Sequence, residues 1–94
     1  MSPYASALIT VHGRVQGVYF RAFTQHHAGK LGLTGYVRNL PGGRSVELRA
    51  EGERQRLEQL VKLLHVGPQG AVVDAVETEW ADYLEMFEDF SIRY

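Results

Sequence analysis

The apolar residues of this chain follow two different periods, and the order in which those periods alternate restricts the folds available to it. Within its 94 residues, a two-residue alternation typical of strands occurs in four segments, at 7–13, 34–40, 45–51 and 72–80. Two segments that favour a helix lie between them, at 20–31 and 53–65. The predicted order is strand, helix, strand, strand, helix, strand, with a short closing strand at Phe90, Ile92 and Tyr94.

The predicted helices each have a face suited to packing. The second helix has an apolar stripe whose members recur every three or four positions, Leu57, Leu60, Val61 and Leu64. The predicted inward positions of the first helix are Phe23, Ala28 and Leu31. Two helices on one face of an antiparallel sheet make an α+β fold, the ferredoxin-like split β-α-β sandwich. Enzymes, regulators and RNA-binding domains all use this architecture, so it leaves the function open.

Length and composition exclude several classes of protein. A chain of this size forms one domain, predicted to span residues 1–94. It has no cysteine, which excludes disulfides, thiolate metal sites and a cysteine nucleophile. No apolar run approaches the roughly 18 residues of a membrane span, and the N-terminus lacks the features of a signal peptide. We therefore expect a cytoplasmic protein without a membrane partner, most simply a monomer.

Charge is distributed unevenly along the chain, although the formal net charge is only -1. No acidic residue precedes Glu47, and five basic residues do: Arg14, Arg21, Lys30, Arg38 and Arg44. After Lys62 there are seven acidic residues and one basic residue, Arg93. Such segregation can concentrate an anionic ligand over part of a surface, but the halves of a sequence need not be halves of a molecule. The near-neutral total does not favour a nucleic-acid partner.

The segment Gly13–Arg21 is a candidate anion site because it runs from a predicted strand into the start of a predicted helix. Backbone N–H groups in the first turn of a helix lack internal partners and carry partial positive charge. A turn containing a glycine such as Gly17 can curl further amides around the same point. Phosphate or sulfate would fit such a site.

Arg21 strengthens this interpretation. A cation near a helix N-terminus is electrostatically unfavourable unless an anion joins it. A guanidinium can bind phosphate through two parallel hydrogen bonds while backbone amides bind the remaining oxygens. The alternative is a solvated arginine beside an ordinary glycine turn, and these physical arguments leave both interpretations open.

Two segments resemble the signature motifs of one enzyme family. The run Gly13-Arg14-Val15-Gln16-Gly17-Val18-Tyr19-Phe20-Arg21 resembles the first motif of the acylphosphatase family, and Tyr36-Val37-Arg38-Asn39 resembles the second. The similarity continues through Glu51-Gly52 and the closing segment 90–94, so it covers essentially the whole chain. The resemblance implies the ferredoxin-like fold and an enzyme that hydrolyses small-molecule acyl phosphates to a carboxylate and inorganic phosphate.

The resemblance also implies roles for particular residues. Arg21 corresponds to the phosphate-binding arginine of the family, and Asn39 corresponds to the asparagine that orients the attacking water. The implied phosphate cradle consists of the backbone amides of Val15, Gln16, Gly17, Val18, Tyr19, Phe20 and Arg21. Without the resemblance, Asn39 would be interpreted as a turn residue leading into 40–43.

The neighbours of Asn39 carry two further expectations. Val37 and Asn39 share one face of their strand, so Arg38 should point away into solvent. Some family members carry a hydroxyl residue directly after this asparagine, whereas this chain has Leu40. Polar support for Asn39 would then come from elsewhere, and Thr24 is a candidate.

The implied reaction needs few groups. The segment contains no Cys, Ser, Asp or His, so a covalent phosphoenzyme is not expected there. The leaving carboxylate has a conjugate acid with a pKa of about 4, so it can depart without a general acid. No cofactor is expected, and His26 and His27 point about 100° apart on their helix, so they are poor joint metal ligands and no metal site is expected.

Other functions remain open from the sequence. The fold could carry a catalytically silent anion-binding or regulatory module, the acylphosphatase-like domain of a larger hydrogenase-maturation protein, or an RNA binder. The presence of both Arg21 and Asn39 speaks against a silent module. The chain starts at Met1 and ends after its last predicted strand without zinc-binding cysteines, which favours a separate small enzyme.

Overall fold

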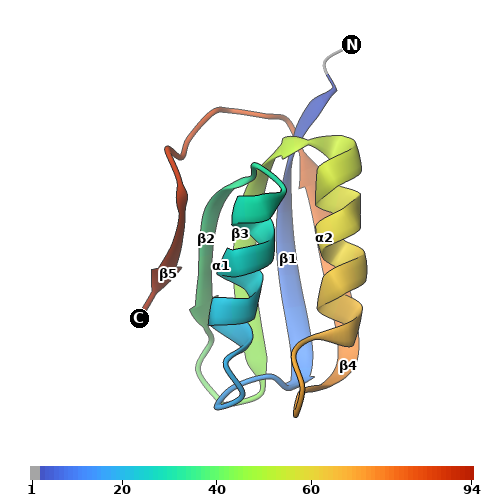
Figure 1. Ribbon diagram of the computed structural model, residues 1–94, viewed down its shortest axis with the longest axis vertical. Coiled ribbons are helices and arrows are strands. Elements are labelled where there is room, and N and C mark those ends of the chain that lie inside the picture. Colours follow the sequence, from blue (N-terminus) through green and yellow to red (C-terminus); the bar gives the residue numbers. More distant parts are fainter. Residues whose placement is uncertain (1–2) are drawn as a thin grey trace.

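The computed structural model describes residues 3–94, which form two helices and one five-stranded sheet (Figure 1). In chain order the elements are β1 (Tyr4–Arg14), α1 (Phe20–Lys30), β2 (Thr34–Asn39), β3 (Ser45–Glu53), α2 (Arg54–Val66), β4 (Val72–Ala81) and β5 (Phe90–Arg93). The strands lie in the order β4-β1-β3-β2-β5, and both helices cover the same face of the sheet (Figure 1). The predicted order of elements and the ferredoxin-like α+β fold are confirmed.

The sheet is mixed, so the prediction of a wholly antiparallel sheet is wrong for β5. β1 pairs antiparallel with β3 and β4, and β2 pairs antiparallel with β3. β5 instead runs parallel to β2, with Gly35 opposite Phe90 and Arg38 opposite Arg93. Residues 82–89 cross from the β4 edge to the β2 edge, so β5 begins at the same end of the sheet as β2 (Figure 1). Parallel neighbours require a crossover of this kind.

The core lies between the helices and the sheet face that they cover. Alternate residues of β1 and β3 are fully buried there: Ala7, Ile9, Val11, Val46, Leu48 and Ala50. The predicted stripe of α2 is confirmed, since Leu57, Leu60 and Leu64 are fully buried and Val61 packs at the margin.

On α1 the buried positions are Phe20, Thr24 and Ala28, which are spaced by four residues and so share one side of the helix. The prediction is right for Ala28, but Phe23 and Leu31 are only partly buried. The Phe23 ring lies on the flank of the helix, 6.0 Å from the Phe20 ring between centroids.

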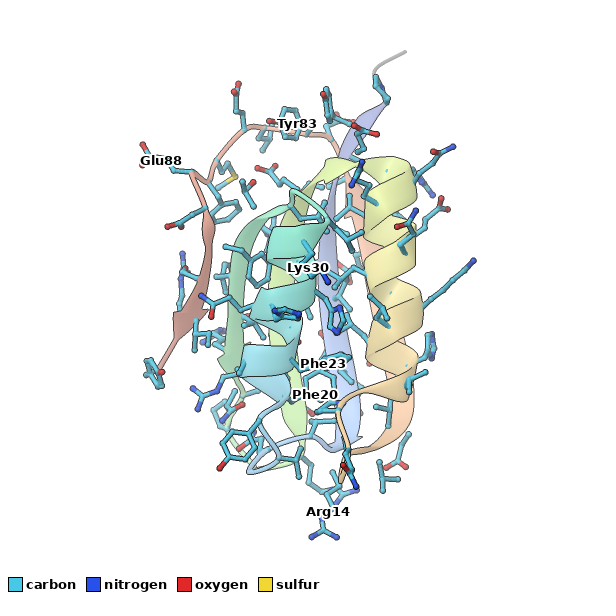
Figure 2. The ribbon with its side chains drawn as sticks, in the orientation of Figure 1. Arg14, Phe20, Phe23, Lys30, Tyr83 and Glu88 are labelled. Carbon is cyan, nitrogen blue, oxygen red and sulfur yellow. The ribbon has the colours of Figure 1, made fainter. Side chains whose placement is uncertain are left out.

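The segment 82–89 is fastened at the end of the sheet opposite the β1–α1 loop. The Glu51 side chain is buried there, and its carboxylate accepts hydrogen bonds from the backbone N–H groups of Leu84 (3.0 Å) and Met86 (2.8 Å). The rings of Tyr4 and Tyr83 lie 5.3 Å apart beside it. Figure 2 shows Tyr83 on this segment and Arg14 at the other end of the molecule. These contacts set the path that delivers β5 to β2.

Candidate active site

The loop between β1 and α1 has the backbone of an anion nest. Gly17 (φ 75°) and Tyr19 (φ 62°) are left-handed, and Val18 between them is not. This alternation turns successive N–H groups toward one concavity. A left-handed conformation is strained for a non-glycine residue, so Tyr19 is a position where structure overrides local preference. Strain of this kind is concentrated at functional sites.

The amides of this loop are left without acceptors. Within residues 3–94, no hydrogen bond engages the N–H groups of residues 15–21. The helix ladder begins with Phe23, whose N–H donates to the carbonyl of Tyr19 at 3.0 Å. No side chain caps α1, and its first turn has no acidic residue. These N–H groups are therefore available to water or to an external anion.

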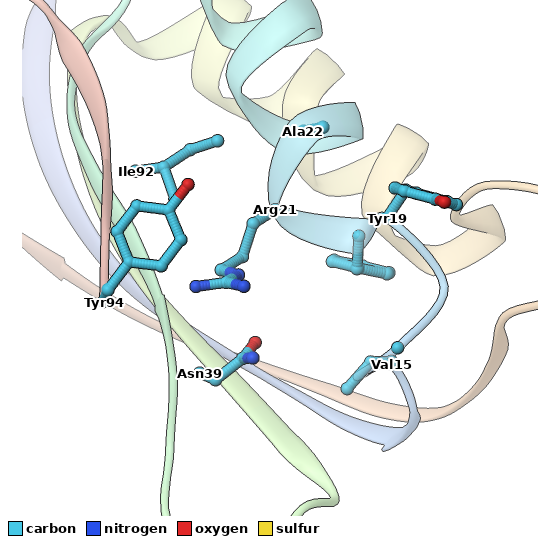
Figure 3. A pocket seen from close by; sticks show the side chains of 9 residues that line it. Val15, Tyr19, Arg21, Ala22, Asn39, Ile92 and Tyr94 are labelled. Carbon is cyan, nitrogen blue, oxygen red and sulfur yellow. The ribbon is translucent and has the colours of Figure 1, made fainter.

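A cavity of about 390 Å³ lies beside these amides, between α1, β2 and β5. Its lining residues are Val15, Gly17, Tyr19, Phe20, Arg21, Ala22, Asn39, Ile92 and Tyr94. Figure 3 shows the Arg21 guanidinium and the Asn39 carboxamide directed into the same space, with Val15 on the loop side. The structure thus brings together both predicted catalytic side chains and most of the predicted cradle. Gln16 and Val18, which belong to the predicted cradle, are not among the lining residues.

Arg21 is held from one side by the end of the chain. Its Nη1 donates to the carbonyl oxygen of Arg93 at 3.3 Å, and its Cζ lies 4.7 Å from the centre of the Tyr94 ring. None of the ion pairs found within residues 3–94 involves Arg21. The guanidinium is therefore a cation without a carboxylate partner, placed beside the positive end of α1. An external anion would relieve this excess of positive charge.

Asn39 is the last residue of β2 and is half-buried. In the part of the chain that the structure describes, its carboxamide has no hydrogen-bond partner. The support expected from Thr24 is absent, because the buried Thr24 hydroxyl donates to the Phe20 carbonyl at 2.9 Å within its own helix. A helix hydroxyl can bond the carbonyl one turn earlier, and this local bond wins over the longer-range one. The polar atoms of Asn39 remain free to bind water.

Arg38 lies outside the cavity, as its position in the strand predicts. It is exposed on the other face of the sheet, where its Nε donates to Glu47 at 2.7 Å. This hydrogen bond, together with the negative charge of Glu47, raises the pKa of the Arg38 guanidinium above its usual value. Arg38 is therefore permanently charged and paired, and it is available as a control position.

No sequence pattern placed the closing segment in the site, yet Ile92 of β5 and Tyr94, which follows this strand, line the cavity. The alternation of Phe90, Ile92 and Tyr94 predicts a strand, but it does not indicate which other strand this one pairs with. The acidic part of the chain lies mainly elsewhere: Asp74 and Glu77 of β4 pair with Arg44 and His12. These two acidic residues of the β4 edge therefore lie against basic residues from the first half of the chain, so the charge segregation of the sequence is not kept in space there.

Residues 3–94 lack two other kinds of feature. No group of three or more His, Asp or Glu side chains is arranged to hold a metal ion there. No helix in this part of the chain is long and apolar enough to cross a membrane.

The fold and the cavity define an α+β domain of the ferredoxin-like class with an anion site at a strand-to-helix junction. The sequence profile of the acylphosphatase family matches residues 7–92. The acylphosphatase of Caldivirga maquilingensis is 54% identical over 86 residues, which are 92% of this chain and 90% of that protein. That of Methanococcoides burtonii is 48% identical over 87 residues, 93% of this chain and 90% of that protein.

Solved structures agree with this result. The crystal structure of acylphosphatase from Bacillus subtilis superposes with a TM-score of 0.91 at 39% identity, covering 96% of this chain and 99% of that one. The chain belongs to the acylphosphatase family. It is an enzyme that hydrolyses acyl phosphates, as the resemblance of its motifs predicted, and its similarity extends over about nine tenths of the length of these curated relatives.

Proposed function

We propose that the cavity between α1, β2 and β5 is the active site, and that water attacks the phosphorus of a bound acyl phosphate there directly. One observation carries the proposal: a guanidinium without a carboxylate partner, a run of loop amides without acceptors and a carboxamide without a hydrogen-bond partner meet at one cavity. Arg21 and the amides of 15–21 bind the phosphoryl oxygens. Asn39 holds the attacking water on the side of the phosphorus opposite the leaving carboxylate.

The chemical step uses no covalent enzyme intermediate. A bond forms between the water oxygen and phosphorus while the bond from phosphorus to the carboxylate oxygen breaks, and its electron pair leaves with the carboxylate. A phosphoryl oxygen accepts the proton of the water. The cavity is lined by no Cys, Ser, His, Asp or Glu, so the described lining offers no such nucleophile or general base. Because this transition state is loose, positioning and charge stabilisation supply the catalysis.

The site binds mainly the phosphate group, so we expect it to accept acyl phosphates with different acyl groups. We also infer that residues 1–94 form a single domain that acts as a monomer in the cytoplasm. The absence of cysteine suits a reducing compartment, and the small size of the chain suits one domain. Light scattering tests the monomeric state, and cell fractionation tests the cytoplasmic location.

The experiment that tests the mechanism follows benzoyl phosphate by ultraviolet absorbance, with 4-nitrophenyl phosphate as a monoester control. We expect turnover of the anhydride alone, competitive inhibition by inorganic phosphate, and no phosphorylated protein in the mass spectrum after a rapid acid quench. A phosphoenzyme that forms and decays at the rate of turnover would overturn direct water attack. Noncompetitive inhibition by phosphate would separate the anion site from the active site.

A further inference from the structure

The side chain of Gln16 leaves the anion loop and reaches the β2–β3 hairpin. Its Nε2 donates to the carbonyl oxygen of Leu40 at 2.8 Å and to that of Ser45 at 2.9 Å. Carbonyl oxygens only accept, so these two partners determine which end of the carboxamide faces them. Both N–H bonds of the amide group are therefore used on backbone atoms of another part of the fold.

The two acceptors lie on either side of the hairpin turn that follows Asn39. Leu40 follows Asn39 in the chain, and Ser45 is the first residue of β3. The N–H of Leu40 donates to the same Ser45 carbonyl at 3.0 Å, which closes the hairpin. Within residues 3–94, the bonds of Gln16 are the hydrogen bonds that join the 15–19 loop to this hairpin. Gln16 thus connects the loop that carries the cradle to the backbone that carries Asn39.

We propose that Gln16 is a positioning residue of the reaction, which holds the Asn39 carboxamide in register with the amide cradle. This inference rests on the proposed function. The Asn39 side chain has no protein partner of its own, so its place depends on the backbone of the hairpin. Residues 41–44 beyond it are exposed. The hairpin end is also bonded to β1, through the N–H of Gly13 to the carbonyl of Arg44 at 2.9 Å and through His12 to Ser45 at 2.8 Å. These bonds do not reach the 15–19 loop, so without the two bonds from Gln16 the loop can shift relative to the hairpin.

Such a shift acts on turnover rather than on phosphate binding. Attack in line with the leaving group requires the water within a narrow range of positions, and a misplacement of about 1 Å can cost about 10²-fold in rate. The phosphate is bound by Arg21 and the loop amides, which Gln16 does not contact through its side chain. Since Gln16 does not line the cavity, its side chain acts through Asn39 and does not touch the reactants.

Gln16→Met tests the inference, because methionine has a similar reach and no donor. Gln55→Met on the exposed side of α2 is the matched control. With benzoyl phosphate we expect kcat to fall about 10- to 100-fold in Gln16→Met, while the inhibition constant of inorganic phosphate stays within about 3-fold of wild type. Unchanged kcat would overturn the inference. A loss of phosphate affinity as large as the loss of kcat would also overturn the inference, since the two hydrogen bonds of Gln16 would then determine the shape of the phosphate cradle.

A double-mutant cycle with Asn39→Ala separates positioning from a general structural effect. If Gln16 acts through Asn39, Gln16→Met should lower kcat no further, within about 2-fold, once Asn39 is absent. A full multiplicative loss in the Asn39→Ala background would refute action through Asn39. Gln16→Lys restores N–H donors of similar reach and should recover most of the turnover, and failure to exceed Gln16→Met would count against the two hydrogen bonds.

A substitute variant and a comparison of three proteins separate failure of this inference from failure of the proposed function. If Gln16→Met does not fold, Gln16→Asn carries the same test, because its amide is one methylene too short to reach both carbonyls. If wild type turns over benzoyl phosphate, Asn39→Ala does not, and Gln16→Met matches wild type, the inference fails while the proposed function stands. If Asn39→Ala keeps wild-type turnover, the proposed role of Asn39 in holding the water fails, and the inference fails with it.

Discussion

The two ends of the sheet differ in whether the protein itself supplies acceptors for the backbone N–H groups that lie there. At the end beyond β1, the amides of residues 15–21 have no acceptor within residues 3–94 and adjoin an open cavity. At the other end, the amides of Leu84 and Met86 donate to the carboxylate of Glu51, a side chain only 1% exposed. Arg14 and Tyr83 mark the two ends in Figure 2.

The difference distinguishes an anion that belongs to the fold, the carboxylate of Glu51, from a site that binds an anion from outside. Carboxylate and phosphate oxygens are both strong acceptors for N–H groups. Where the chain supplies the anion itself, through Glu51, the contact is permanent and fastens the connection to β5. Where the chain places Arg21 and no carboxylate, the amides and the guanidinium remain available to an anion from outside. The same type of hydrogen bond thus stabilises the fold at one end and is reserved for substrate at the other.

We call the end of the sheet with the cavity the open end, and the end with Glu51 the closed end. The largest effect should come from removing Arg21, the cation of the open end. We expect Arg21→Ala to lower kcat/KM for benzoyl phosphate by more than about 10³-fold, because the change removes both a charge and a pair of hydrogen-bond donors. Inorganic phosphate should also stop raising the thermal unfolding temperature. Steady-state kinetics and differential scanning fluorimetry measure the two effects.

Arg38→Ala is the matched control, since Arg38 lies on β2 beside Asn39 but pairs with Glu47 on the other face. It should keep kcat/KM within about 3-fold and lose at most about 1 kcal/mol of stability. Equal losses of activity in the two variants would mean that the overall positive charge matters, and not the cavity.

The next effect concerns the side chain that holds the water. We expect Asn39→Ala to lower kcat by about 10²- to 10³-fold, since one preorganised polar group is removed. Binding of inorganic phosphate, followed by competitive inhibition, should remain within about 3-fold of wild type. Comparable losses of turnover and phosphate affinity would contradict the assignment of Asn39 to the water.

The closed end should respond in stability and not in phosphate affinity. We expect Glu51→Gln to reduce the free energy of unfolding by about 1–3 kcal/mol, because the buried side chain then turns an NH₂ group toward one of the two backbone N–H groups, which loses its acceptor. Urea denaturation measures this change, and the inhibition constant of phosphate should stay unchanged. Glu79→Gln, at an exposed position of β4, should change stability by less than about 0.5 kcal/mol. A loss of phosphate affinity in Glu51→Gln without a loss of stability would remove the contrast between the two ends.

The smallest effect concerns the left-handed backbone of the open end. An added Cβ at Gly17 meets nothing within 4 Å, so Gly17→Ala should cost only the backbone strain, about 1–2 kcal/mol. Gly32→Ala has nearly the same φ, 70° against 75°, also in open space, and should lose similar stability. Phosphate affinity should weaken a few-fold in Gly17→Ala alone. A matching decrease in Gly32→Ala would show that the cradle is not specifically affected.

The sequence by itself determined the features that neighbouring residues control. The periods of β1, β3 and α2 predicted their positions to within a few residues, since each depends on which residues share a face of a strand or helix. The glycine turn before α1 predicted the unpaired amides, because the start of any helix leaves N–H groups free. The resemblance of the motifs predicted that Arg21 and Asn39 belong to one site, and the fold brings them to one cavity.

Only the tertiary structure decided the features that depend on distant segments. The parallel direction of β5 follows from the path of residues 82–89, and the Arg21–Arg93 contact joins residues 72 positions apart. The bonds of Gln16 to the hairpin and of Glu51 to the crossover are of the same kind. Each is formed because chain topology brings a side chain to a backbone group far away in sequence. The local periodicity of the sequence cannot predict such a contact, since the free energy of the pairing depends on the packing of every element in between.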